Sequence, residues 1–185
     1  MEGWAIGGII VFVVIIWVVG TYNILVRLKN HCRESWSAID TELKRRYDLI
    51  RNLVETVKGY ATYEKETLQK VVEARNLAVA SHGSPASQAR DENALVGALK
   101  SLFVVVEKYP ELKASANFLK LQQELANTED RIQAARRFYN ANVRDLNTRL
   151  EVVPSNIIGG IFKFGKEEFF EIESAIERTA PSVHL

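Results

Sequence analysis

The stretch GWAIGGIIVFVVIIWVVGTYNILV, residues 3–26, runs without a single charged side chain. A helix of this length covers roughly 36 Å, which exceeds the roughly 30 Å hydrocarbon core of a bilayer. A signal peptide would have a basic start and a shorter apolar region, whereas the acidic residue Glu2 precedes this stretch. Trp4 and Tyr22 stand near its two ends, where a membrane–water interface favours aromatic side chains. We therefore predict an uncleaved membrane anchor over residues 1–28.

The charges that flank the apolar stretch predict its orientation. Arg27, Lys29 and Arg33 follow the stretch, while no lysine or arginine precedes it. Basic residues next to a membrane-spanning helix are enriched on the cytoplasmic side. The sequence therefore predicts a single-pass protein of the cell (inner) membrane, with its N-terminus outside and its large C-terminal part in the cytoplasm. The lipid bilayer is then its first predicted partner.

The composition of the chain excludes several classes of protein. The 24 basic and 23 acidic residues leave a formal charge of +1, whereas nucleic-acid-binding domains usually carry a one-sided basic excess. We therefore expect no nucleic-acid partner. The single cysteine, Cys32, cannot form a disulfide or a cysteine metal site within the chain. Its neighbour His31 could activate the thiol, and its position near the membrane could suit palmitoylation, but we favour an inert cysteine.

No motif for catalysis or for a cofactor is found along the sequence. The three histidines, His31, His82 and His184, lack the partners at helical spacing that a zinc-binding HExxH motif provides. No serine lies in a GxSxG motif, and no glycine loop has the pattern that binds phosphate. We therefore predict a non-enzymatic protein without a cofactor or a metal site.

Beyond the anchor, hydrophobic periodicity predicts helices over most of the chain. The stretch IDTELKRRYDLIRNLVETVKGYA, residues 39–61, has one narrow apolar seam, and only Gly59 interrupts the helical pattern from Thr21 to about Ala80. Further helices are predicted at residues 87–108, 115–150 and, as a short one, 166–177. The predicted fold class is therefore all-α: a transmembrane helix followed by an antiparallel bundle of three to four long helices. This bundle covers residues 29–153, and a segment rich in glycine and phenylalanine follows at residues 154–185.

In this arrangement the first helix is longer than the second, so the second helix cannot cover the whole apolar seam of the first. The second predicted helix covers only roughly 33 Å, so it reaches back to about Val57. Seam side chains nearer the membrane would then lack a partner, although burying each is worth about 1.5 to 3 kcal/mol. We therefore predict that these side chains pair between copies of the chain in a homo-oligomeric stem. They are Trp36, Ile39, Leu43, Tyr47 and Ile50.

Polar residues on the first and third predicted helices allow two interpretations. They could line a ligand pocket between helices, or they could be solvated faces and ion pairs beside a coiled-coil seam, which we favour. The candidate pocket residues are Arg45, Glu55, Arg136 and Asn140.

The terminal segment carries several phenylalanines that could contact a membrane surface, cap the bundle or bind another subunit. If three helices alternate in direction, the segment begins at the end of the bundle far from the membrane, which favours a cap or a subunit contact. The candidate contact residues are Phe162, Phe164, Phe169 and Phe170.

Six stretches of the sequence together resemble the bacterial LemA family. They are WSAID (36–40), LKRRYDLI (43–50), NLVETVKGYA (52–61), YPELKASANFLKLQQEL (109–125), TEDRIQAARRFYN (128–140) and PSNIIGGIFKF (154–164). The resemblance extends from Tyr22 to about Phe170. It implies a short exposed N-terminus, one transmembrane helix and a bundle of long antiparallel helices, without an established enzymatic activity. The chain departs from the family at Arg51, where proline is frequent, and near Tyr63, where a histidine is frequent.

Some members of that family belong to magnetosome membranes, which implies a role in membrane organisation. We therefore predict a non-enzymatic, membrane-anchored helical scaffold that self-associates or organises membrane protein partners. The alternative is a sensor or accessory subunit that binds a small ligand or a partner protein in a polar pocket between helices.

Overall fold

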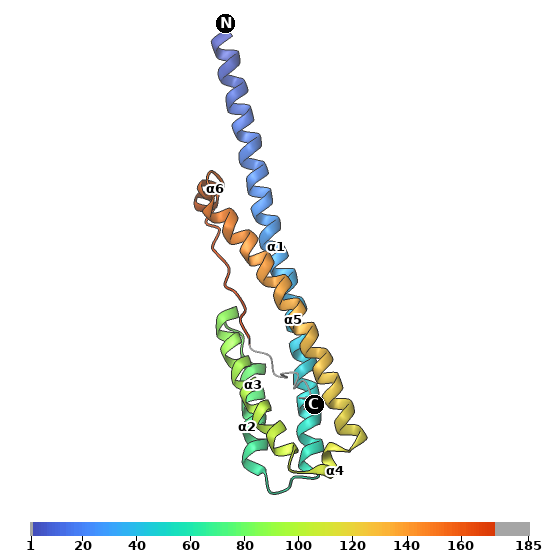
Figure 1. The fold of residues 1–185 in the computed structure, drawn as a ribbon. Coiled ribbons are helices and arrows are strands. Elements are labelled where there is room, and N and C mark those ends of the chain that lie inside the picture. The colour runs from blue at the N-terminus through green and yellow to red at the C-terminus, as the bar shows by residue number, and fades with distance from the viewer. Residues whose placement is uncertain (1, 173–185) are drawn as a thin grey trace, which may run out of the picture. The chain divides into compact units, whose positions relative to one another are not determined.

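The computed structural model describes residues 2–172, and every regular element in that range is a helix (Figure 1). The predicted all-α fold class is thus confirmed. The helices are α1 (Glu2–Lys58), α2 (Lys65–Ala80), α3 (Pro85–Val106), α4 (Pro110–Lys113), α5 (Ala116–Glu151) and α6 (Ser155–Ile161). The chain divides into two compact units: Met1–Ser37 with Phe138–Glu168, and Ala38–Arg137 with Phe169–Leu185. Helices α1 and α5 each contribute residues to both units.

The first part of α1 is the uncharged stretch, and its side chains are exposed. Every residue from Gly3 to Trp17 is exposed, including Phe12 at 64% and Ile9 at 63% of their full surface. By length and composition, α1 is apolar enough to cross a membrane.

The first helix ends earlier than predicted. Helix α1 ends at Lys58 and α2 begins at Lys65, so the expected continuous helix to Ala80 is wrong. Gly59 costs about 1 kcal/mol relative to alanine inside a helix, and the tyrosines and threonine that follow it are poor helix formers too. The amide of Ala61 donates to the carbonyl of Val57 at 2.8 Å and closes the turn. As a result α2 and α3 form an additional antiparallel pair (Figure 1).

The bounds of α3 and α5 follow local sequence signals. Ser84 caps the start of α3, where its hydroxyl accepts a bond from the amide of Ser87 at 3.4 Å and Pro85 occupies the first helical turn. Helix α3 therefore begins two residues before its predicted start at Ser87. Helix α5 agrees with its prediction to within one residue at each end.

The seam of α1 is covered within the chain. In the second unit, Ile39, Leu43 and Ile50 are at most 2% exposed, and Tyr47 is also buried. In the first unit, the half-buried ring of Trp36 packs on Tyr139, with centroids 5.2 Å apart. The expectation that these five side chains lack an intrachain partner is therefore wrong, and the argument for a homo-oligomeric stem loses its premise.

The terminal segment also differs from its prediction. Helix α6 forms where the glycines suggested irregular structure, and residues 164–172 are extended although a helix was expected from Lys166. The remainder of that predicted helix, residues 173–177, lies outside the described residues. Gly159 permits close packing, since a Cβ atom there would stand 2.7 Å from Cδ2 of Leu150. The end of α6 is closed by bonds from the amides of Phe164 and Lys163 to the carbonyls of Gly159 and Gly160, with Lys163 at a φ of 55°.

The terminal segment lies beside the apolar stretch and not at the far end of the bundle. The rings of Phe162 and Phe164 pack on Tyr22, with centroids 4.8 Å and 5.7 Å apart. The expected position was wrong because it counted one helix where α1 and α2 are two. The additional helix reverses the direction of α5, so that in the first unit α5 runs toward the apolar stretch.

Candidate functional site

The second unit contains a buried cluster of charged side chains contributed by three helices. The side chain of Arg46 on α1 is only 1% exposed, and those of its partners Glu92 on α3 and Glu129 on α5 are 2% and 4% exposed. Nη1 of Arg46 donates to Oε2 of Glu129 at 3.1 Å, and Nη2 pairs with Oε2 of Glu92. We call these three side chains the charge cluster.

Helical spacing explains why these charges face the interior. Arg46 follows Leu43 by three residues and precedes Ile50 by four, so it must share their buried face. Glu129 stands between the buried residues Leu125 and Ile132 at the same spacings. Solvated faces, which the sequence suggests for polar residues on these helices, do not describe Arg46 and Glu129, because their ion pairs lie inside the bundle. Spacing from apolar neighbours is the signal that could have identified them.

Tyr47 contacts the charge cluster from the adjacent position on α1. Its hydroxyl donates to Oε1 of Glu92, and its backbone carbonyl accepts a bond from Nε of Arg75 at 2.8 Å. Burial raises the pKa of Tyr47 to about 12, so the phenol keeps its proton and remains a donor at neutral pH. Tyr47 was predicted to contact another subunit, whereas here it hydrogen-bonds within its own chain.

The charge cluster is suited to fixing helix register. A buried arginine is tolerated only where carboxylates compensate its charge, and this requires α1, α3 and α5 to be aligned. Two glutamates face one arginine, and Oε1 of Glu129 is buried without a hydrogen-bond partner among the described residues. Within residues 2–172, no group of three or more His, Cys, Asp or Glu side chains is placed to hold a metal ion.

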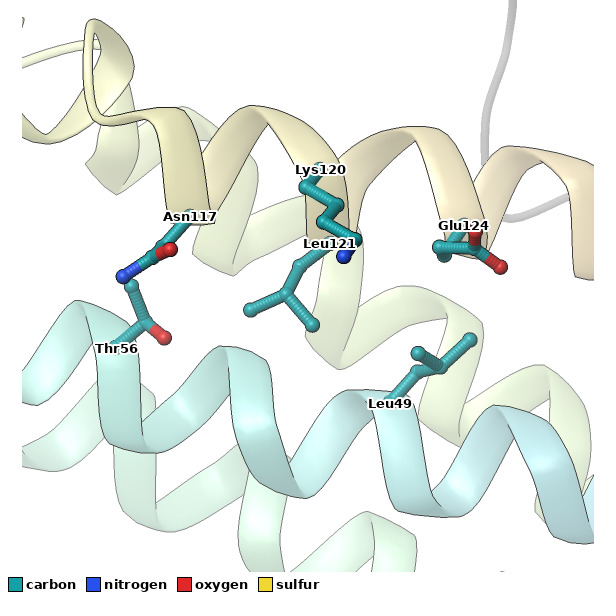
Figure 2. A pocket seen from close by; sticks show the side chains of 6 residues that line it. All are labelled: Leu49, Thr56, Asn117, Lys120, Leu121 and Glu124. Atoms are coloured by element: carbon teal, nitrogen blue, oxygen red, sulfur yellow. The ribbon is translucent and has the colours of Figure 1, made fainter.

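A shallow groove of about 370 Å³ lies between α1 and α5 in the second unit. Figure 2 shows Leu49 of α1 and Leu121 of α5 pointing toward each other between the two helices. Polar side chains form the remainder of its lining: Thr56, Asn117, Lys120 and Glu124. This combination of apolar floor and polar rim could hold a small ligand or a segment of another protein.

None of the four predicted pocket residues lines this groove. Arg45 lies next to it, where Nη2 pairs with Oε2 of Glu124 at 2.8 Å. Glu55 is exposed on α1, and Arg136 donates to the backbone carbonyl of Ile172. Asn140 is half-buried and belongs to the first unit. A ligand pocket that joins all four stays a prediction.

The phenylalanines of the terminal segment contact their own chain. Besides Phe162 and Phe164 on Tyr22, Phe170 is fully buried in the second unit, while Phe169 is 40% exposed. Asn147 on α5 bonds both the carbonyl and the amide of Glu167, at 2.9 Å and 3.0 Å. These paired bonds hold the extended backbone against α5 in the first unit.

Cys32 has the properties of an inert thiol. It is buried in the first unit. Burial, followed by the nearby carboxylates of Glu167 and Asp145, raises the pKa of Cys32 to about 11. At neutral pH almost none of the thiol is ionised, and the thiolate is the reactive form. The structure therefore favours the inert cysteine over an activated one.

These features define a class: an all-helical protein whose exposed apolar helix continues into a bundle with charges paired in its interior. The chain belongs to the LemA family, whose sequence profile matches residues 35–185. The predicted family is thus confirmed.

Three curated proteins illustrate the similarity. Protein LemA of Metamycoplasma hominis is 32% identical over 144 residues, which cover 76% of this chain and 64% of that protein. Magnetosome protein MamQ 2 of Paramagnetospirillum magneticum is 26% identical over 83% of this chain and 66% of its own length. Magnetosome protein MamQ of Magnetospirillum gryphiswaldense is 24% identical with the same coverage. The chain thus matches slightly less than two thirds of the length of these relatives.

Proposed function

We propose that this protein is a membrane-anchored helical scaffold without enzymatic activity. The observation that carries the proposal is the continuity of α1, which bears the exposed apolar stretch at one end and buried seam residues at the other. A bilayer would cover the first set of side chains, as the bundle covers the second. The similarity to proteins named for the magnetosome supports a role at a membrane.

The proposed orientation places the bundle in the cytoplasm and the N-terminus outside. Arg27, Lys29 and Arg33 support it, because they follow the apolar stretch directly. A cysteine at the exposed position Gln122, in a Cys32→Ser background, should react with an impermeant maleimide only after the inner membrane is opened. Labelling in cells with an intact inner membrane would reverse the orientation.

In this proposal, self-association uses the apolar stretch, because the seam is already covered within the chain. Gly3 and Gly7 are four residues apart in an apolar helix, a spacing that lets two helices approach closely. An added Cβ at either glycine would meet no other atom within 4 Å, so this face is open.

Cross-linking in intact membranes, followed by mass spectrometry, tests the scaffold directly. The full chain should cross-link to itself or to other membrane proteins, and Gly7→Leu should reduce the self-linked fraction several-fold. Gly20→Leu is the matched control, because Gly20 is equally open but lies outside the glycine pair. A chain that cross-links to neither itself nor other proteins would contradict the scaffold.

The groove between α1 and α5 supports a second candidate, an accessory subunit that binds a partner protein. Its volume of about 370 Å³ is at the small end for ligand sites, and it is open to solvent. Leu121→Asp should abolish cross-links to such a partner. Leu119→Asp should not, since Leu119 is 49% exposed on α5 outside the groove. Equal loss in both variants would argue against the groove as a binding site.

A further inference from the structure

Helix α6 is apolar on the face that it does not bury. Ser155, Ile158 and Gly159 are buried, and they face the remainder of the first unit, to which α6 belongs. The opposite face and the adjoining turns expose large apolar side chains. They are Val152 at 46%, Val153 at 77%, Ile157 at 55%, Ile161 at 65% and Phe162 at 48%. Five such side chains in eleven consecutive residues form an exposed apolar surface. Surfaces of this kind are costly in water and usually mark a site of interaction.

The contacts of this surface place it at one end of the apolar stretch. Phe162 and Phe164 pack on Tyr22, and the neighbouring Leu25 is fully buried. The helix from Gly3 to Tyr22 covers roughly 30 Å, which is about the thickness of a hydrocarbon core. Tyr22 therefore stands at the depth where the core meets the headgroups, and α6 lies beside it.

The side chains around α6 fit that depth. Aromatic rings favour the membrane–water interface, and three rings meet there at Tyr22. Lys163 is exposed at the end of α6, directly after the apolar surface, where its ammonium group can reach lipid phosphates. Lys166 is paired with Glu151 at 2.6 Å, so Lys163 is the better candidate for a headgroup contact.

We propose that α6 and its adjoining turns, residues 152–163, dock into the interface of the same bilayer that α1 spans. The occupant of the exposed apolar face is thus lipid. The bilayer would then hold the first unit at two points, the transmembrane helix and α6, which fixes the tilt of that unit relative to the membrane. This inference rests on the membrane anchor of the proposed function.

Fluorescence quenching by spin-labelled lipids tests the docking in the full chain. Single cysteines at Val11, Phe138 or Ile161, in a Cys32→Ser background, would carry a bimane label. The chain would be placed in phosphatidylcholine–phosphatidylglycerol vesicles, with a nitroxide near the headgroup or deep in the acyl chain. Phe138 is the matched control for Ile161, because the two are 62% and 65% exposed. Phe138 directly precedes Tyr139, whose ring packs on Trp36. Trp36 lies roughly 21 Å beyond Tyr22 along α1, on the side away from the apolar stretch.

The docking predicts a distinct pattern at the three positions. The shallow nitroxide should quench the label at position 161 about two-fold or more above the label at position 138, while the deep nitroxide quenches position 11. Quenching at position 11 with none at 161 would overturn the docking and leave the anchor intact. No quenching at position 11 would overturn the anchor and, with it, the docking.

Two further measurements separate lipid from other occupants and from misfolding. Val153→Asp with Ile157→Asp should lower quenching at position 161 to the level of position 138, while Ile157→Leu keeps it. Helix content and quenching at position 11 should stay unchanged in both variants. Quenching at 161 should also persist when each vesicle holds at most one chain. If it is lost at that dilution, a second copy and not lipid covers the face, and the proposal is wrong.

Discussion

The two parts of α1 differ in which side chains they expose and which they bury. Near its start, every residue from Gly3 to Trp17 is exposed although nearly all are apolar, whereas farther along Arg46 is only 1% exposed although it is charged. The difference lies in the partners that the chain supplies. Helices α3 and α5 bring carboxylates to Arg46, and in the proposed membrane setting lipid covers the apolar end. Burial in this protein is thus decided by what surrounds a side chain as much as by its polarity.

The largest expected effect comes from removing the buried charge in this comparison. Arg46→Met leaves Glu92 and Glu129 buried without their counter-charge, which should lower the free energy of unfolding by about 3 to 5 kcal/mol. Arg45→Met is the matched control. Arg45 is the adjacent arginine, and its ion pair with Glu124 is partly exposed, so its loss should cost less than about 1 kcal/mol. Urea titration of the full chain in detergent, followed by circular dichroism, measures both.

A triple variant sharpens this result. Replacing Arg46, Glu92 and Glu129 together by apolar residues of similar size should restore most of the lost stability, because no buried charge remains unpaired. Equal destabilisation by Arg46→Met and Arg45→Met would contradict the burial of Arg46.

A smaller effect is expected from alkaline pH. The pKa of Tyr47 is raised from 10.0 to about 12, mainly by burial, so the folded state keeps its proton longer than the unfolded state does. The corresponding stability is fully present below pH 10 and is lost as the pH rises to about 12. The loss should be about 2 kcal/mol. In Tyr47→Phe this part of the pH dependence should disappear from unfolding curves measured between pH 9 and 12. An unchanged slope in the variant would contradict the assignment.

The smallest effect concerns the turn beside the apolar end of α1. Lys163 has a φ of 55°, a conformation that glycine adopts without strain. Lys163→Gly should therefore raise the free energy of unfolding in detergent by about 0.5 to 1 kcal/mol. Lys166→Gly is the control, since its φ is not positive and glycine there only adds chain entropy. A thermal melt in which Lys163→Gly is the less stable of the two would contradict the strain.

Much of the fold follows from local patterns in the sequence. The apolar stretch, the seam at Ile39, Leu43 and Ile50, and the bounds of α5 all depend on periodicity within one helix. The end of α1 was missed because Gly59 is a weak signal alone, and the bonds that join Tyr47 of α1 to α2 depend on a reversal of the chain that no local pattern predicts. That single error also reversed the direction of α5 and misplaced Phe162 and Phe164.

The candidate site was harder to predict than the fold. Arg46 meets Glu92 and Glu129 across 46 and 83 positions of sequence, and no local pattern pairs them. Their spacing from buried apolar residues marks each as inward-facing, but the pairing depends on how three helices are arranged. The position of α6 beside the apolar stretch likewise depends on the contact between Tyr22 and Phe162, which are far apart in the sequence.

The central claim, that lipid covers one end of α1 and protein the other, is tested most directly by thiol accessibility in lipid nanodiscs. Val11 and Asn52 are both exposed in the isolated chain, so single cysteines there, in a Cys32→Ser background, would react alike if no bilayer covered α1. Nanodiscs leave both membrane faces open to a water-soluble maleimide. We predict that the cysteine at position 11 reacts at least about ten-fold more slowly than that at position 52. Equal rates in nanodiscs would contradict the account.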